Sequence, residues 1–400
     1  MIGKPLQMFV LTWLTMTVLL TIAYGQGSPN VTFLTQVNDY PASDYNDCWG
    51  YTAPDGREYA LLGVENGTSI IDITDAANAS EVAFISSANS IWKDIKTIQH
   101  YAYAVNETGG GLQIFDLSNL PNSVTELPAF NGFSDMHNIY IDEANAMLYA
   151  SPAVGNASCR AISLADPENP VQLSTFGVHN HDAYARDNIV YLAEGTNGAF
   201  SIWDLSNPNS PQFLQRQFIP ASGYVHNLWL TDDGKYLMTT EETVGKTVKF
   251  WDIQNLDNIQ LVENYLGPNN FAHNTHIKGN YAYISHYGSG LRIVDISNPN
   301  DIFEVGFYDT QSAWGAWPFF ASGKVLISDI SQGLFVVFFE EAVEGFSFAK
   351  TVNEGWNLVG LPNLPNNSHY LNLFPNASEN SMFTFNGSYV EATEFIEGIG

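Results

Sequence analysis

The sequence predicts an all-β fold built from seven copies of one unit. The phrase GLRIVDISNP, residues 290–299, recurs in altered form along most of the chain. Its Asp position is occupied by residues spaced 41 to 48 apart, namely Asp72, Asp116, Ser163, Asp204, Asp252, Asp295 and Phe338. No segment longer than a few residues shows helical periodicity. Repeats of about 45 residues are typical of propellers, so we predict a seven-bladed β-propeller.

One repeat shows how a blade is expected to be built. Residues 271–277, 281–285, 291–296 and 303–308 are four runs of strand-forming residues. Gly279-Asn280 lies between the first two runs and Gly288-Ser289-Gly290 between the next two, and both are tight-turn sequences. Each blade should therefore contain four antiparallel strands.

The two ends of the repeat array are expected to close the ring. Residues 31–37, VTFLTQV, resemble a fourth strand but precede the first unit, whereas the last unit lacks a fourth strand after residues 334–339. We therefore predict that the early segment supplies the missing outer strand, which leaves the ring without an open blade.

Composition limits the partners of this chain. The formal net charge is −28, with 42 acidic and 14 basic residues, so a nucleic acid is excluded as a partner on electrostatic grounds. Only Cys48 and Cys159 occur, and they fall in units one and three, so no disulfide framework is expected and both cysteines should be unpaired.

The two termini indicate export. Residues 1–25 combine Lys4, an apolar stretch and the small-x-small sequence Ala23-Tyr24-Gly25, which is the pattern of a cleaved signal peptide. The apolar stretch is short for a membrane span, so none is expected after cleavage. We place the propeller at residues 26–344 and a small C-terminal β module at 345–400. Because the sequence stops inside an expected strand run at 397–400, this anchoring or sorting region is expected to be truncated.

A second repeated position lies 22 to 26 residues before each anchor. It is occupied by Trp49, Trp92, His137, His181, His226, His273 and Trp314. Each residue should open the first strand of its blade, and first strands line the central channel of a propeller. We therefore expect these side chains to surround one mouth of the channel.

Imidazoles and carboxylates at this mouth would make a metal site. The second strands return to the same face and end in residues that include Glu194, Glu241 and His286, while His276 lies close to His273. Neutral imidazole nitrogens with nearby carboxylates suit a divalent metal ion. The pattern leaves calcium, zinc and copper open. The alternative is that the repeat inherited a packing residue, so that each imidazole is bonded within its own blade.

Other polar and aromatic residues suit ligand contact better than catalysis. Trp49, Trp92, Trp314 and Trp317 are candidates for stacking on a planar ligand, with core packing as the alternative. Asp182 follows His181 and is a further candidate at the mouth. The repeated Asp of the third strand should cap the turn that follows it. No phosphate-binding loop, nucleophile elbow or CxxC motif is present, so the catalytic residues, if there are any, are unknown.

The repeats resemble those of LVIVD-repeat proteins, in particular the choice-of-anchor B family of exported bacterial proteins. The resemblance covers residues 31–339 and rests on sequences such as GTSIIDIT, GLQIFDLS, HDAYARDNIVYLAEG and AHNTHIKGNYAYISHYGSGLRIVDISNP. It implies a propeller in the bacterial periplasm or on the outer cell surface. It implies no particular reaction and no catalytic residue.

These observations favour a surface-anchored binding protein for a protein or a glycan, more readily than an enzyme. One alternative is a metal-dependent enzyme whose centre lies among the histidines of the channel mouth. Another is a structural component of a surface layer.

Overall fold

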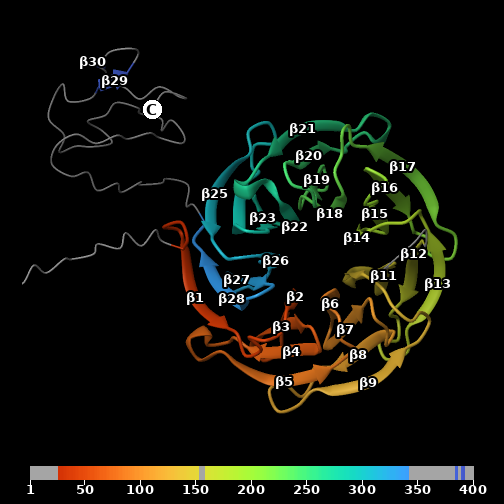
Figure 1. The fold of residues 1–400 in the computed structure, drawn as a ribbon. Coiled ribbons are helices and arrows are strands. Elements are labelled where there is room, and N and C mark those ends of the chain that lie inside the picture. Colours follow the sequence, from red (N-terminus) through yellow and green to blue (C-terminus); the bar gives the residue numbers. More distant parts are fainter. Residues whose placement is uncertain (1–25, 153–157, 342–382, 386–388, 392–400) are drawn as a thin grey trace, which may run out of the picture. The chain divides into compact units, whose positions relative to one another are not determined.

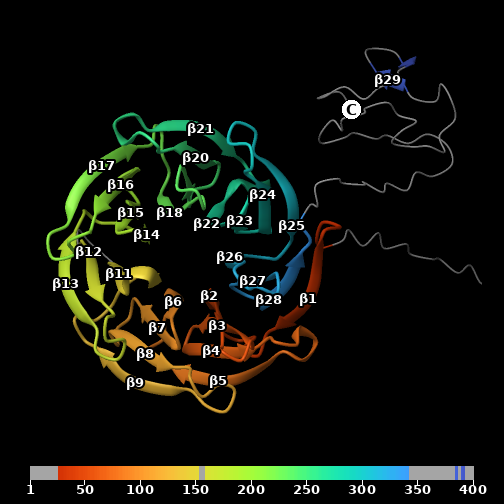
Figure 2. The same cartoon turned by 180° about the vertical axis from the view of Figure 1, so that it is seen from behind.

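The computed structural model describes residues 26–152, 158–341, 383–385 and 389–391. The expected signal peptide and most of the C-terminal region lie outside the described residues. Seven four-stranded antiparallel sheets are arranged in a ring, which confirms the seven-bladed β-propeller (Figure 1 and Figure 2). Apart from single 3-10 turns, the described residues contain no helix.

Each blade runs from an inner first strand to an outer fourth strand. Blade one contains β2 (Tyr45–Thr52), β3 (Glu58–Val64), β4 (Gly67–Asp72) and β5 (Ser80–Ser86). Blade two contains β6 (Lys93–Ile98), β7 (Tyr101–Asn106), β8 (Leu112–Asp116) and β9 (Thr125–Phe130). Blade three contains β10 (Asn138–Asp142), β11 (Met147–Ser151), β12 (Cys159–Ser163) and β13 (Val171–Phe176).

Blades four to six follow the same plan. Blade four contains β14 (Asp182–Arg186), β15 (Ile189–Ala193), β16 (Ala199–Asp204) and β17 (Gln212–Phe218). Blade five contains β18 (Val225–Leu230), β19 (Tyr236–Glu241), β20 (Val248–Asp252) and β21 (Gln260–Tyr265). Blade six contains β22 (Ala272–Lys278), β23 (Tyr281–His286), β24 (Gly290–Asp295) and β25 (Phe303–Tyr308). The single 3-10 turns are η1 (Ala76–Asn78), η2 (Glu143–Asn145), η3 (Leu256–Asn258) and η4 (Pro268–Asn270).

The seventh blade closes the ring with strands from both ends of the array. It contains β26 (Ala313–Trp317), β27 (Lys324–Asp329), β28 (Gly333–Phe339) and, as its outer strand, β1 (Val31–Val37). Antiparallel pairing runs from Val31 opposite Phe339 to Val37 opposite Leu334. The red β1 accordingly lies beside the blue β28 in both views (Figure 1 and Figure 2). The predicted closure is confirmed.

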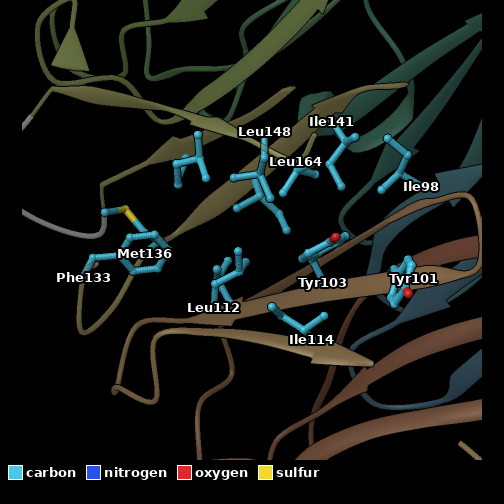
Figure 3. Close-up of a cluster of buried hydrophobic side chains, with 14 residues drawn as sticks. Ile98, Tyr101, Tyr103, Leu112, Ile114, Phe133, Met136, Ile141, Leu148 and Leu164 are labelled. Atoms are coloured by element: carbon cyan, nitrogen blue, oxygen red, sulfur yellow. The ribbon is translucent and has the colours of Figure 1, made fainter. Parts of the chain in front are cut away.

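Apolar side chains fill the spaces between neighbouring blades. Figure 3 shows one such cluster, in which Tyr103 and Leu112 of the second blade face Ile141 and Leu148 of the third. Second and third strands are buried nearly throughout, as expected for sheets covered on both faces. The core is therefore distributed around the ring instead of forming one central cluster.

The repeated Asp has the turn-capping role expected from the sequence. Its carboxylate accepts a hydrogen bond from the backbone N–H two residues later, as between Asp204 and Ser206 (2.7 Å) and between Asp295 and Ser297 (2.8 Å). Ser163 replaces the carboxylate with its hydroxyl, which accepts from the N–H of Ala165 at 3.3 Å. This repeated residue stabilises the turn after the third strand.

The remaining global expectations concern the cysteines, the tail and the membrane. Cys48 and Cys159 are both buried and unpaired, as expected. The chain divides into two compact units after Glu341, and in the second unit β29 (Phe383–Phe385) pairs with β30 (Tyr389–Glu391). Among the described residues, no helix has the length and apolarity needed to cross a membrane.

The closing strand should limit the stability of the whole ring. Val31 and Val37 are buried in two different apolar clusters, so Val31→Asp and Val37→Asp should each cost at least about 2 kcal/mol of unfolding free energy, the transfer free energy of a buried valine. Urea denaturation measures this loss. Thr32→Asp is the matched control, because Thr32 is exposed on the same strand. Equal effects of all three substitutions would contradict closure by β1.

A chain ending at Glu344 should fold as well as the full chain. All seven blades are complete by Phe339, and the last backbone hydrogen bond of this part joins the Glu340 N–H to the Asn30 carbonyl at 2.9 Å. The melting temperatures of the chain ending at Glu344 and of the full chain should therefore agree within about 2 °C, a shift that corresponds to less than about 1 kcal/mol. A much lower melting temperature would show that the tail belongs to the same cooperative unit.

Candidate functional site

Four imidazoles form an arc at one end of the channel. His137 and His181 directly precede β10 and β14, while His226 and His273 are the second residues of β18 and β22. The ring centroids of successive histidines are 4.2, 3.9 and 4.1 Å apart along the order 137, 181, 226 and 273. The structure thus brings together the four histidines that the repeat aligned.

Cross-blade hydrogen bonds orient these rings. The Nδ1 of His181 is 3.0 Å from the carbonyl oxygen of His226, and the Nδ1 of His273 is 2.6 Å from the carbonyl oxygen of Trp314. The Nδ1 of His137 lies 2.5 Å from Oε1 of Glu107. All three acceptors require a proton on Nδ1, which leaves Nε2 of each neutral ring with its lone pair.

Burial keeps most of these imidazoles uncharged. It lowers the pKa of His181 and His226 well below the usual range, and the neighbouring imidazoles lower both values further. Burial likewise lowers the pKa of His273 to about 3, although its hydrogen bond to the Trp314 carbonyl acts in the opposite direction. At neutral pH these three rings therefore offer lone pairs instead of positive charge.

The carboxylates that reach the arc are Glu107 and Glu242. Oε2 of Glu242 lies 3.6 Å from Nε2 of His226. Glu241 instead forms an ion pair with Lys249 inside its own blade, so the structure does not bring it to the arc. Because successive side chains of a strand point to opposite sides, the two adjacent glutamates face different surroundings. The EE sequence at 241–242, combined with this alternation, was a signal for Glu242 that sequence reasoning missed.

Two other second-strand residues also lie away from the arc. Glu194 is buried in an ion pair with Arg216 of the same blade. His286 is buried beside Tyr265, with ring centroids 6.2 Å apart, and does not line either channel cavity. The structure therefore does not bring Glu194 and His286 together with the four histidines of the arc.

His276 lies in a deeper, aromatic layer of the channel. Its ring centroid is 4.5 Å from that of Trp229 and 6.0 Å from that of Trp49. Burial lowers its pKa to about 3, and the positive charge of Lys96 contributes to that shift. The structure separates His276 from the arc, three residues further along the same strand as His273.

Strand pairing corrects the position assigned to two tryptophans. In blades five and six, Val225 and Ala272 pair with the last residues of the second strands, and the histidine of the arc is the next residue in each case. In blade one the same place is taken by Asn46, because Tyr45 pairs with Val64. In blade two, Asp94 accepts a hydrogen bond from the first strand of the following blade, and Asn227, the residue after His226, does the same in blade five. Lys93, the residue before Asp94, therefore takes the place of the histidine in blade two. Counting from the third strand failed because the intervening turns vary in length.

The four tryptophans consequently have different environments. Trp49 packs in the deeper layer with Trp317, whose ring centroid is 5.9 Å away, and Trp317 is buried, so both are packing residues. Trp314 lies beside His273 at 4.9 Å and lines the channel. Trp92 is 43% exposed at the rim of the mouth. Only the last two remain positioned for contact with a ligand.

Two cavities occupy this end of the channel. The outer one has a volume of about 220 Å³ and is lined by Trp92, Glu107, His137, Pro152, His179, His181, Tyr224 and Glu242. The inner one, about 30 Å³, lies among the histidines and the polar layer beneath them. The outer cavity has room for a single side chain or sugar ring, and the inner one for little more than an ion or a water molecule.

A layer of polar side chains lies beneath the arc. Lys96 forms ion pairs with Asp94 and, at 3.1 Å, with Asp47. Asp182 accepts a hydrogen bond from Nδ2 of Asn227 at 2.6 Å. Burial and, to a lesser extent, the nearby charge of Asp94 together raise the pKa of Asp182 to about 6. Asp182 is thus held within the polar layer, where it lines the inner cavity.

Comparison with known proteins supports the repeat and the fold. Residues 271–310 match the LVIVD repeat. None of the curated proteins matches the chain. Many solved structures match, among them the Kuenenia stuttgartiensis hydrazine synthase, with a TM-score of 0.57 and 13% sequence identity over 72% of this chain and 94% of that chain. At this identity the likeness concerns the fold alone, because propellers have many unrelated functions.

The buried imidazoles predict loss of stability in mild acid. The pKa of His286 is lowered by burial from 6.5 to about 3, so the unfolded chain binds a proton below pH 6.5 that the folded chain does not. In a chelator, the unfolding free energy should fall from pH 6.5 to pH 5 by about 2 kcal/mol for this group. Asp182, whose pKa is raised, opposes this loss of stability by a smaller amount. Its contribution is the same in the unsubstituted chain and in the variant compared with it below.

The contribution of His286 can be isolated by comparing the chain with its His286→Leu variant. Urea denaturation at several values across this pH range gives the slope of the unfolding free energy against pH. In the variant this slope should correspond to about one fewer proton taken up on unfolding. The variant removes one titrating group and leaves the arc unchanged. Identical slopes would mean that folding does not lower the pKa of His286.

Proposed function

We propose that this chain is an exported bacterial binding protein that docks an extracellular protein on the channel-mouth face of its propeller. Exposed Trp92 is the observation that carries the proposal. Its ring borders a cavity large enough for one side chain, and a large aromatic group at such a rim gains most from burial by a partner. The propeller fold itself is compatible with protein interaction.

Hydrogen bonds from Ser90 hold the backbone of the loop around Trp92. The hydroxyl of Ser90 accepts a hydrogen bond from the Trp92 N–H at 3.1 Å and donates one to its carbonyl oxygen at 2.9 Å. These contacts hold the backbone while the indole stays exposed. A partner would therefore lose less conformational entropy in fixing this residue than in fixing a mobile loop.

Other exposed apolar residues lie on loops of the same face. First strands start at this face and second and fourth strands end there, so the connections that leave them belong to it. These connections carry Val178, Val244 and Leu266, which are 42, 68 and 51% exposed. Together with Trp92 they surround a polar centre with apolar anchors, an arrangement suited to a protein surface.

The cellular setting is proposed from the ends of the chain. The apolar leader at residues 1–25 supports export, and the resemblance to choice-of-anchor B proteins supports a place in the periplasm or on the outer cell surface. A net charge of −28 favours partners with basic surfaces and disfavours nucleic acid. A glycan stacked on Trp92 is the competing ligand.

The proposal is tested by peptide selection against the full chain. Peptides chosen from a random phage-displayed library should lose affinity by about 30-fold against Trp92→Ala, the loss expected for an anchoring tryptophan. Phe213→Ala is the matched control, because Phe213 is 54% exposed on the outer strand β17 and away from the mouth. Peptides that depend on Phe213 instead of Trp92 would contradict docking at the mouth. Binding on a glycan array that requires Trp92 would replace the protein partner with a sugar.

A further inference from the structure

In the arc of histidines, imidazoles from neighbouring blades contact one another directly. Nδ1 of His137 faces the Glu107 carboxylate and Nδ1 of His181 faces the His226 carbonyl, so both Nδ1 atoms carry protons. The Nε2 atoms of the same two rings are nevertheless only 2.6 Å apart. The two rings therefore face each other through their Nε2 atoms at hydrogen-bonding distance.

A second group of donors converges next to this pair. One ring nitrogen of His226, one of His273 and one carboxylate oxygen of Glu242 all lie within 4.8 Å of one another. Two ligands of a tetrahedral zinc ion lie about 3.4 Å apart when each is about 2.0–2.2 Å from the metal. The three donor atoms therefore need to move inward by only about 1 Å to share one ion.

The surroundings of these donors match those of a metal centre. The hydrogen bond from Nδ1 of His273 to the Trp314 carbonyl fixes the ring orientation and leaves Nε2 available, as is usual for histidines that bind metals. The Nδ1 of His226 is buried without a hydrogen-bond partner, and both histidines are 2% exposed. Such burial excludes competing water from two of the donors, whereas Glu242 also lines the outer cavity.

We propose that His226, Glu242 and His273 bind one divalent transition-metal ion of the zinc or copper class, with the remaining coordination position open toward the outer cavity. Two imidazole nitrogens and one carboxylate oxygen suit these ions, whereas calcium prefers oxygen ligands only. Glu242 and His181 both line the outer cavity, which leaves room for an exchangeable ligand beside the ion. This inference is independent of partner docking through Trp92.

The ligand set also distinguishes this centre from the polar layer beneath it. Lys96 neutralises Asp47 and Asp94, so those carboxylates already have a cationic partner. Glu194 and Glu241 are paired with Arg216 and Lys249 in the same way. At the mouth, by contrast, neither Glu107 nor Glu242 is paired with a lysine or arginine of the described residues: Glu107 contacts His137, and Glu242 contacts His226 and the hydroxyl group of Tyr287.

The test is a calorimetric titration of the chelator-treated full chain with Zn²⁺ alone. One ion should bind per chain, and His226→Gln, His273→Gln and Glu242→Gln should each weaken binding by more than about 100-fold, because even residues that only orient metal ligands change affinity by about 10- to 100-fold. His276→Gln is the matched control, because this histidine is also buried, lies on the same strand as His273 and is outside the ligand set. The affinity of this control variant for Zn²⁺ should equal that of the unsubstituted chain.

Further readouts separate binding from folding. Zn²⁺ should raise the melting temperature of the unsubstituted chain and of His276→Gln but not of the three ligand variants, whose circular dichroism should remain that of the propeller. Ca²⁺ should not compete with Zn²⁺. Absence of Zn²⁺ binding, equal weakening by His276→Gln, or displacement of Zn²⁺ by Ca²⁺ would each overturn the proposal.

Discussion

Ring closure by the β1–β28 pair is the constraint on which the rest of the structure depends. The outer strand of the seventh blade comes from the beginning of the propeller, so the pairing joins segments about 300 residues apart in sequence. Each blade packs apolar side chains against both neighbours, and an open ring would expose two such faces. Closure therefore couples the stability of every blade to one pair of strands.

The inner strands add polar links between blades to this closure. The side chain of Asp94 accepts a hydrogen bond from the N–H of Ile139, and that of Asn227 accepts one from the N–H of Thr275. Each link joins a first strand to the first strand of the next blade. The links hold the inner strands in a common register, and this register is what brings histidines from four separate blades to one level of the channel.

Irregular pairing in the first strands shapes the mouth of the channel. The register shifts in β18 between Val225 and Leu228 and in β22 between Ala272 and Thr275. Such a bulge breaks strict alternation, so that His226 and Asn227 both line the inner cavity. The imidazole level and the polar level can therefore lie directly above one another, with neutral nitrogen donors nearest the outer cavity and buried ion pairs beneath.

The sequence by itself determined the features that recur in every unit. The spacing of Asp204, Asp252 and Asp295 set the number of blades, and their carboxylates cap local turns, which requires no distant partner. The spare strand at residues 31–37 determined closure, because a repeat with one strand extra and one missing has a single way to close. The arc of histidines followed from equal positions in successive units.

Only the tertiary structure decided which side chains face the arc. Glu242 reaches His226 whereas Glu241 binds Lys249, and one residue of strand alternation separates these outcomes. The pairing of Tyr45 with Val64 places Asn46 and not Trp49 at the mouth, and this pairing is not encoded by spacing along the chain because the turns between strands vary in length. Contacts across blades depend on the rotation of each strand about its own axis, and that rotation is set only when the ring packs and closes.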